Sequence, residues 1–295
     1  MSSVRHENRY GPAPGITPMS VIRSDMGPWR ERRRYWNELG LDSGKGRTAD
    51  PFGGMAEYKE HPLPSGPSLF DPVLAEASYR WYCPDGGSIL DPFAGGSVRG
   101  LVAGNGGYRY TGVDLSGVQV AANRDQAAEW EARDLLAVPP RWVEGDSAKT
   151  LSLLADGAFD YVFTCPPYHN LERYSDHPDD LSSMRWPRFE RAYREIVAES
   201  ARCLAPDRFS TWVVGDVRDS AGRIRGLVPL TIDAHRAAGM HLHNDAVLLN
   251  VIGTAAMRLP AQWRASRKVA RIHQYVLTFV KGDGKRATGA LPPFV

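Results

Sequence analysis

The stretch Ser88-Ile-Leu-Asp-Pro-Phe-Ala-Gly-Gly-Ser-Val-Arg-Gly100 combines a short β-rich run, a glycine turn and the start of a helix. Gly95 and Gly96 allow the backbone to approach a ligand closely and to adopt positive φ. The free amide groups at the start of the following helix suit a carboxylate or a phosphate. The spacing differs from the G-x-G-x-x-G of nicotinamide and flavin enzymes. By itself, the turn is equally well explained as a tight strand-to-helix connection without a ligand.

Short β-rich runs and helical patterns alternate on both sides of this loop. Strands are predicted at 88–91, 110–114, 141–144, 160–165, 210–215, 245–251 and 274–280, and helices at 28–41, 71–82, 98–103, 117–133, 188–204 and 228–238. This alternation favours a mostly parallel sheet covered by helices on both faces. No helix is obvious between the last two strands, which predicts a terminal antiparallel hairpin. We therefore expect a Rossmann-like α/β fold with a seven-stranded, mostly parallel sheet that ends in an antiparallel hairpin.

Composition excludes several other classes of protein. The chain has 295 residues, of which 42% are hydrophobic and 24% charged, as in ordinary soluble domains. No run approaches the roughly 18 apolar residues of a membrane helix, and the first residues lack a signal-peptide pattern. The three cysteines lie far apart without a CxxC motif, which excludes a zinc ribbon and suits a reducing cytoplasm. The net charge of +2 is too balanced to indicate a partner.

The ends of the chain differ from its middle. Residues 1–62 are expected to form an N-terminal arm with a basic helix and a Gly/Pro-rich connector. Residues 63–282 are expected to form a single α/β domain, and residues 283–295 a loose tail. His241 and His243 alternate on one predicted strand, but no third ligand has a suitable spacing, so no metal site is expected.

Two acidic residues follow the next two predicted strands. Asp114 ends the second strand, and a carboxylate there can accept hydrogen bonds from both hydroxyls of a ribose. Asp146 follows the third strand and could accept a hydrogen bond from an adenine amine. Each acid alone is more often a turn or helix-capping residue. Because parallel strands end at one edge of the sheet, both acids and the glycine loop together indicate a site for an adenosine-containing cofactor.

The fourth predicted strand runs into Cys165-Pro166-Pro167-Tyr168. Two prolines after a strand hold the backbone extended, and such a turn can leave the Pro166 carbonyl pointing into a cleft. This carbonyl and the Cys165 side chain could bind one amino group, while Tyr168 offers a flat face to a base. An exocyclic amine is a poor nucleophile, and hydrogen bonds that pull it toward tetrahedral geometry increase its reactivity. A plain strand terminator is the alternative.

These residues resemble the S-adenosylmethionine-dependent DNA amino-methyltransferases that act on adenine N6 or cytosine N4. In that family, a D-P-F-x-G-G/S-G-like loop holds the methionine part of the cofactor, and a [D/N/S]-P-P-[Y/F/W] turn holds the target amine. The run Asp91–Ser97 matches the loop, and Pro166-Pro167-Tyr168 matches the turn at three of four positions. The motif order, with PSLFDPVL (67–74) before the loop, is similar to the γ-type arrangement. Further runs, including LERYSD (171–176), resemble a phage- and prophage-associated branch, and the similarity covers roughly residues 20–282.

The resemblance implies S-adenosyl-L-methionine as cofactor and double-stranded DNA with an extruded base as substrate. The residues expected around the cofactor are Phe70, Asp91, Phe93, Gly95, Gly96 and Ser97 at the methionine end, Asp114 at the ribose and Asp146 at the adenine ring. Those expected at the target amine are Cys165, Pro166, Pro167 and Tyr168. Cys165 stands where the family has Asp, Asn or Ser, and a thiol is a weak donor and a weaker acceptor. The sequence does not choose between adenine and cytosine.

Basic residues are expected to contact DNA phosphates. Between the last two strands, the acid-free segment that contains Arg258 also carries the predicted contact residues Arg264, Arg267, Lys268 and Arg271. The recognition elements are expected within 169–187 and 253–273, with Glu172 and Tyr174 beside the target base. A second cluster in the N-terminal helix, formed by Arg30 and Arg32–Arg34, is equally well explained as a solvated face. Methylation of RNA or of a glutamine side chain, and a catalytically weak cofactor-binding module, remain open; a nicotinamide oxidoreductase is a more distant alternative.

Overall fold

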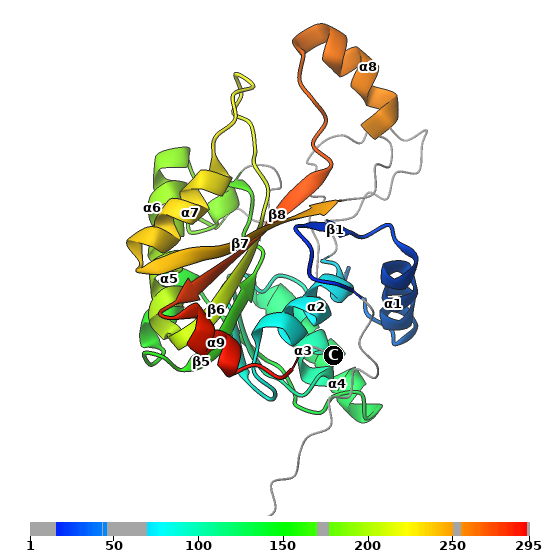
Figure 1. Ribbon diagram of the computed structural model, residues 1–295, viewed down its shortest axis with the longest axis vertical. Helices are drawn as coiled ribbons and strands as arrows, with labels where there is room; N and C mark the ends of the chain where they lie inside the picture. Colours follow the sequence, from blue (N-terminus) through cyan, green and yellow to red (C-terminus); the bar gives the residue numbers. More distant parts are fainter. Residues whose placement is uncertain (1–15, 43, 46–69, 170–176, 250–254, 294–295) are drawn as a thin grey trace, which may run out of the picture.

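The computed structural model describes residues 16–42, 44–45, 70–169, 177–249 and 255–293 as one α/β body with helices on both faces of a twisted sheet (Figure 1). The strands are β1 (Val21–Arg23), β2 (Ser88–Asp91), β3 (Arg109–Asp114), β4 (Arg141–Glu144), β5 (Phe159–Thr164), β6 (Leu204–Val214), β7 (Met240–Leu249) and β8 (His273–Lys281). The helices are α1 (Gly27–Glu38), α2 (Pro72–Tyr82), α3 (Val98–Asn105), α4 (Gly117–Ala132), α5 (Ser147–Thr150), α6 (Trp186–Cys203), α7 (Leu227–Ala237), α8 (Ala255–Ser266) and α9 (Gly284–Gly289).

The eight strands run in the order β1-β7-β8-β6-β5-β2-β3-β4. Strand β8 is antiparallel to β6 and to β7, and all other neighbours are parallel. The carboxyl ends of β2 to β7 therefore lie at one edge of the sheet, called here the carboxyl edge. The predicted Rossmann-like α/β fold is confirmed, as is the antiparallel pairing of the last two predicted strands.

Alternating side chains of the central strands supply two hydrophobic cores, because successive residues of a strand point to opposite faces. Ile89 and Tyr161 belong to the core under α1 to α4, whereas Leu90 and Val162 belong to the core under α5 to α7. Figure 1 shows these two groups of helices on opposite sides of the sheet. Central parallel strands buried on both faces explain why these runs are continuously apolar.

Several elements differ from the expectations, among them the short helix α5, which was not predicted, and β6 and β7, which begin earlier than predicted. Strand β1 pairs in parallel with β7 and makes the sheet eight-stranded rather than seven-stranded; three residues are too few for an alternating pattern to stand out. Helix α8 lies between β7 and β8, where no helix was expected; Pro260 inside it masks the helical pattern. Helix α9 occupies part of the expected loose tail, and its Ala287 is buried.

The N-terminal basic helix α1 packs against α2. The Glu76 carboxylate is fully buried and accepts hydrogen bonds from Arg32 Nε at 2.7 Å and Trp36 Nε1 at 2.8 Å. Arg33 forms an ion pair with Asp71, the residue that caps the start of α2. Two of the four clustered arginines are therefore used inside the protein, which favours the structural interpretation of this helix. The expected arm and connector lie largely outside the described residues.

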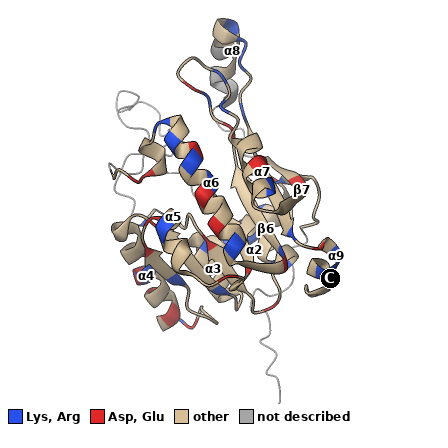
Figure 2. Cartoon of the chain, turned by 90° about the vertical axis from the view of Figure 1, so that its left-hand side faces the viewer, with Lys and Arg blue, Asp and Glu red and all other residues tan. Residues whose placement is uncertain are grey.

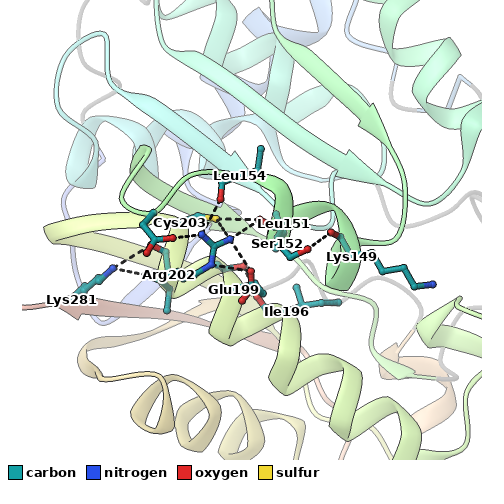
Figure 3. A network of polar contacts seen from close by, with 12 residues as sticks. Lys149, Leu151, Ser152, Leu154, Ile196, Glu199, Arg202, Cys203 and Lys281 are labelled. Atoms are coloured by element: carbon teal, nitrogen blue, oxygen red, sulfur yellow. Dashed lines mark hydrogen bonds and ion pairs between the residues drawn. The ribbon is translucent and has the colours of Figure 1, made fainter.

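Figure 3 shows a polar network at the opposite, amino-terminal edge of the sheet. The Arg202 guanidinium donates to the carbonyl oxygens of Leu151 at 2.8 Å and Leu154 at 2.9 Å. The Lys281 ammonium donates to the carbonyl oxygens of Ala201 at 2.7 Å and Leu204 at 2.6 Å. These donors satisfy backbone acceptors where α6 meets β6, so we interpret the network as structural.

Candidate active site

The glycine loop and the Cys-Pro-Pro-Tyr turn are neighbours at the carboxyl edge, because β2 and β5 pair in the sheet. The loop follows Asp91 at the end of β2, and the turn follows Thr164 at the end of β5. Thr164 Oγ1 donates to Asp91 Oδ1 at 2.6 Å, which joins the two segments directly. The structure therefore brings together the two motifs that the sequence analysis selected.

Asp91 is fully buried and accepts four hydrogen bonds. Its Oδ1 accepts from Thr164 and from the Phe93 amide at 3.1 Å, while its Oδ2 accepts from Arg99 Nε at 2.5 Å and the Tyr110 hydroxyl at 2.7 Å. A carboxylate has about four acceptor positions, so these donors occupy them all. Through its bonds to the Phe93 amide and to Arg99, Asp91 stabilises the conformation of the glycine loop.

Arg99 links this buried centre to the loop above it. Its guanidinium donates to the carbonyl oxygens of Phe93 and Ala94 as well as to Asp91. Burial alone would lower the pKa of Arg99, but the Asp91 carboxylate raises it above its ordinary value, so the buried guanidinium keeps its charge. The guanidinium carbon also lies 4.6 Å from the ring centre of Phe70, whose edge packs on Phe163 at 5.6 Å. Phe70 is thus held in place by Arg99 and Phe163.

Gly95 adopts a left-handed conformation with φ of +51° and is held from both sides. Its amide donates to Asp114 Oδ2 at 2.7 Å, and its carbonyl oxygen accepts from Asn123 Nδ2 at 2.7 Å. Asn123 is itself oriented by Gln119 at 2.9 Å. These α4 residues were not predicted, although buried Gln119, Asn123 and Gln126 recur at helical spacing where apolar residues are usual.

Asp114 retains hydrogen-bonding capacity on both carboxylate oxygens. Oδ1 accepts from the Ser116 amide at 2.8 Å and Oδ2 from the Gly95 amide, so each oxygen still has one acceptor position. Burial raises the pKa of Asp114 to about 6, against the lowering effect of the two amides. A half-buried carboxylate with two open acceptor positions beside a glycine loop fits a vicinal diol.

The remaining predicted cofactor residues have other contacts in this structure. Ser97 is buried, and its hydroxyl donates to Gln126 Oε1 at 3.0 Å inside the protein. Asp146 caps α5 by accepting from the Ala148 amide at 3.0 Å, and its other oxygen lies 3.3 Å from Lys149 Nζ. Gly96 is half-buried at the loop.

Phe93 connects the glycine loop to a column of aromatic side chains on the other face of the sheet. Its ring stacks on Tyr193 at 6.4 Å and meets Trp212 edge-on at 5.9 Å between ring centres. Phe189 and Trp186 continue the column along α6 toward the carboxyl edge. Phe93 is therefore anchored by packing, with part of its ring exposed at the loop.

Tyr168 is fixed across the ends of β6 and β8. Its hydroxyl donates to the Val213 carbonyl oxygen at 3.3 Å and accepts from Gln274 Nε2 at 2.9 Å. Its ring packs on Gly215, where a Cβ would lie 3.2 Å from Tyr168 Cε2. Cys165 Sγ is 3.6 Å from the Tyr168 hydroxyl. Cys165, Pro167 and Tyr168 are half-buried and Pro166 is buried, so the turn is partly open to solvent.

His169, the first residue of the expected recognition element 169–187, follows the turn and is buried. It has a left-handed φ of +51°, is 3% exposed, and its Nε2 lies 2.8 Å from the Met184 carbonyl oxygen. Its ring meets Trp186 and Phe189 edge-on at 5.3 Å and 5.2 Å. A strained histidine packed in this way ties the turn to α6. The candidates Glu172 and Tyr174 lie outside the described residues.

The predicted DNA-contacting residues lie at the carboxyl edge. Helix α8 and the segment after it stand beyond this edge of the sheet in Figures 1 and 2. Arg264, Arg267 and Arg271 are exposed, and Lys268 is half-buried. No ion pair with an acidic residue is found for these four cations within the described part of the chain. The side chain of Arg258 is not described.

Neither a metal-binding cluster nor a membrane-spanning helix is found among the described residues. Among the described residues, no cluster of three or more His, Cys, Asp or Glu side chains is suited to a metal ion. In the same part of the chain, no helix has both the length and the apolar character needed to cross a bilayer.

The fold of this chain is similar to that of several solved structures. No protein-family model matches the chain, and no curated protein matches its sequence. The [4+2]-cyclase SpnF superposes with a TM-score of 0.50 at 21% identity, over 72% of this chain and 82% of that protein. TrmN from Thermus thermophilus gives 0.47 at 16% identity over 72% and 49%, so the match spans about half of TrmN. A TehB-like SAM-dependent methyltransferase from Corynebacterium glutamicum gives 0.44 at 16% identity over 74% and 91%. At such identities the similarity concerns the fold, a Rossmann-like α/β sheet.

Proposed function

We propose that this chain is an S-adenosylmethionine-dependent methyltransferase that modifies an exocyclic amino group of a DNA base, adenine N6 or cytosine N4. The observation that carries the proposal is the direct junction of the two motifs: Thr164, just before the Cys-Pro-Pro-Tyr turn, donates to Asp91, just before the glycine loop. A donor bound in the loop and an amine bound at the turn would then meet at the carboxyl edge, where α/β folds bind ligands.

The residues at the loop fit this cofactor. The open acceptor positions of Asp114 suit the two ribose hydroxyls, and the left-handed Gly95 lets the backbone approach the ligand. Phe70 and Phe93 provide apolar surface for the methionine end. When bound, S-adenosylmethionine supplies an electrophilic methyl group on a sulfonium. We assign Asp91 to shaping the loop, since its acceptor positions are used, and Asp146 and Ser97 to supporting roles.

At the turn, the Pro166 carbonyl and Cys165 would accept hydrogen bonds from the target amine and pull its nitrogen toward tetrahedral geometry. The Tyr168 ring, fixed by Val213 and Gln274, would stack on the base. The new nitrogen–carbon bond uses the nitrogen lone pair as the carbon–sulfur bond breaks. The extra proton on nitrogen can leave to water, because the half-buried turn is open to solvent.

The side chain at position 165 is expected to affect the rate of methylation. A thiol accepts hydrogen bonds more weakly than a carboxylate or amide oxygen, so the Pro166 carbonyl would contribute most of the orientation. We expect Cys165→Asp and Cys165→Ser to retain cofactor binding and to raise the methylation rate. A rate that falls in both variants would assign the thiol a specific role.

The test is transfer of a labelled methyl group from S-adenosylmethionine to duplex DNA, total RNA and protein in parallel, followed by mass spectrometry of the digests. The proposal predicts N6-methyladenine or N4-methylcytosine in DNA, and loss of the product in Pro166→Ala with cofactor binding intact. If label were found only in RNA or at glutamine, the substrate would be RNA or protein and not DNA. Cofactor binding without transfer to any of them would leave a non-catalytic binding module.

A further inference from the structure

The loop between β6 and α7 forms a short hairpin at the carboxyl edge. Arg218 and Ile224 pair across it, and the Arg225 amide donates to the Val217 carbonyl oxygen at 2.9 Å. The Asp216 carboxylate accepts from the Gly226 and Leu227 amides at 2.9 Å and 2.8 Å, which fixes the hairpin to the start of α7. We call residues 216–226 the β6–α7 hairpin.

The Arg225 side chain is linked through Trp186 to His169, the residue that follows the Cys-Pro-Pro-Tyr turn. Its guanidinium carbon is 5.1 Å from the ring centre of Trp186, and Trp186 in turn contacts His169 at the end of the turn at 5.3 Å between ring centres. Stacking on an aromatic face holds an arginine in one orientation while leaving its edge free for hydrogen bonds. The chain of contacts from Arg225 to the turn therefore passes through a single aromatic side chain.

Among the described residues, the Arg225 guanidinium has an open donor. Its Nε is buried and finds no hydrogen-bond partner there, and no carboxylate in the same part of the chain forms an ion pair with it. By contrast, Arg99 and Arg202 satisfy their guanidinium groups with carboxylates and backbone carbonyl oxygens. A buried unpartnered donor is costly, and a planar fork of donors matches a phosphate or a carboxylate.

The surroundings favour an anion of nucleic acid. A Cβ at Gly222, at the tip of the hairpin, would collide with the Lys268 ammonium, so the hairpin and the segment after α8 are in contact. Across residues 216–226 and 264–271 there are seven basic residues and two acidic ones. Both acids, Asp216 and Asp219, already bind backbone amides of the hairpin. The two segments thus form one positively charged surface beside the turn.

We propose that Arg225 binds a backbone phosphodiester of the nucleic acid next to the nucleotide held at the Cys-Pro-Pro-Tyr turn, and that the β6–α7 hairpin forms one phosphate-binding surface with residues 264–271. This rests on the proposed function for the identity of the turn. Its own basis is the unpartnered guanidinium, the stacking on Trp186 and the contact between the hairpin and Lys268.

The test compares Arg225→Met with Arg236→Met. Met keeps an apolar stem on Trp186, whereas Arg236 is an exposed arginine of α7 paired with Asp233. Binding of a 20-base-pair DNA duplex and of an RNA hairpin is measured by fluorescence anisotropy across a potassium chloride series. Arg225→Met should bind its preferred nucleic acid about tenfold more weakly and lower the salt slope by about one. Arg225→Lys should restore the slope but only part of the affinity.

Thermal unfolding and S-adenosylhomocysteine binding should match the wild type in all three variants. Binding of duplex or RNA that depends on Arg225 supports the proposal even if no methyl transfer is found, so the two proposals can fail separately. Arg225→Met with the affinity and salt slope of Arg236→Met would overturn it. So would a wild-type protein that binds neither nucleic acid.

Discussion

Asp91 and Arg99 form a buried ion pair at the base of the candidate site, with side chains 0% and 6% exposed. Removing one partner of such a pair leaves an uncompensated buried charge, which costs about 3–5 kcal/mol. We expect Arg99→Met to lower the free energy of unfolding by about that amount in urea denaturation. The exposed pair of Arg236 offers the control, since Arg236→Met should cost less than about 1 kcal/mol. Equal effects in both variants would contradict the interpretation of Asp91 as a structural centre.

We expect Asp114 to make the affinity for the cofactor depend on pH. Its pKa is raised from 3.8 to about 6, so the carboxylate becomes protonated as pH falls through about 6 and loses acceptor capacity. S-adenosylhomocysteine affinity, measured by calorimetry, should therefore rise between pH 5 and about 7 and then level off. The same raised pKa means that folding stability falls as pH rises from about 4 to about 6, between the pKa values of Asp114 in the unfolded and folded states. Asp114→Asn should bind weakly without this step; a retained step would assign the pH dependence to another group.

Gly215 allows the Tyr168 ring to occupy its position. In Gly215→Ala the new Cβ would lie 3.2 Å from Tyr168 Cε2, so the ring must shift by some tenths of an ångström. Because small misplacements at a reacting centre are costly, we expect kcat to fall about tenfold with S-adenosylhomocysteine affinity unchanged. Gly289→Ala in α9 is the matched control, since a Cβ there meets nothing within 4 Å. A Gly215→Ala enzyme with normal kcat would show that Tyr168 does not position the base.

The last turn of α8 and the segment after it, residues 264–271, are expected to bind DNA through charge. Substituting Arg264, Arg267 and Lys268 by Ala should weaken binding to all duplex sequences similarly and flatten the dependence of affinity on salt. The measurement is a salt titration of duplex affinity, with Arg188→Ala in α6, an exposed arginine paired with Asp179, as the control. An unchanged salt slope would show that these basic residues do not contact DNA.

Elements were predictable from the sequence where local pattern and tertiary context agree. The buried strands β2 and β5 are marked by apolar runs that end at proline-containing turns, and both lie where the sequence placed them. Helix α8 was missed because Pro260 normally ends a helix, and nothing local reveals that this one continues. Strand β1 owes its existence to β7, a partner more than 200 positions away in the chain.

The candidate site was predictable only in part for a similar reason. The strand-ending acids and the two turns could be found because parallel strands bring such positions to one edge. Sequence could not tell which of these acids has open acceptor positions: Asp91 is saturated by partners from three elements, whereas Asp114 is not. Gly215 and Arg225 act through contacts with residues far away in the chain, Tyr168 and Trp186, which no local pattern encodes.

For the whole molecule, the central claim is that the glycine loop and the Cys-Pro-Pro-Tyr turn form one site in which a methyl donor faces a target amine. The most direct measurement is a crystal structure of the protein with S-adenosylhomocysteine. In that structure, we expect the ribose hydroxyls to bind Asp114 and the homocysteine end to lie along Phe93 and Gly95. We expect the sulfur to point toward Pro166 and Tyr168. A ligand bound elsewhere, or a sulfur turned away from that turn, would contradict it.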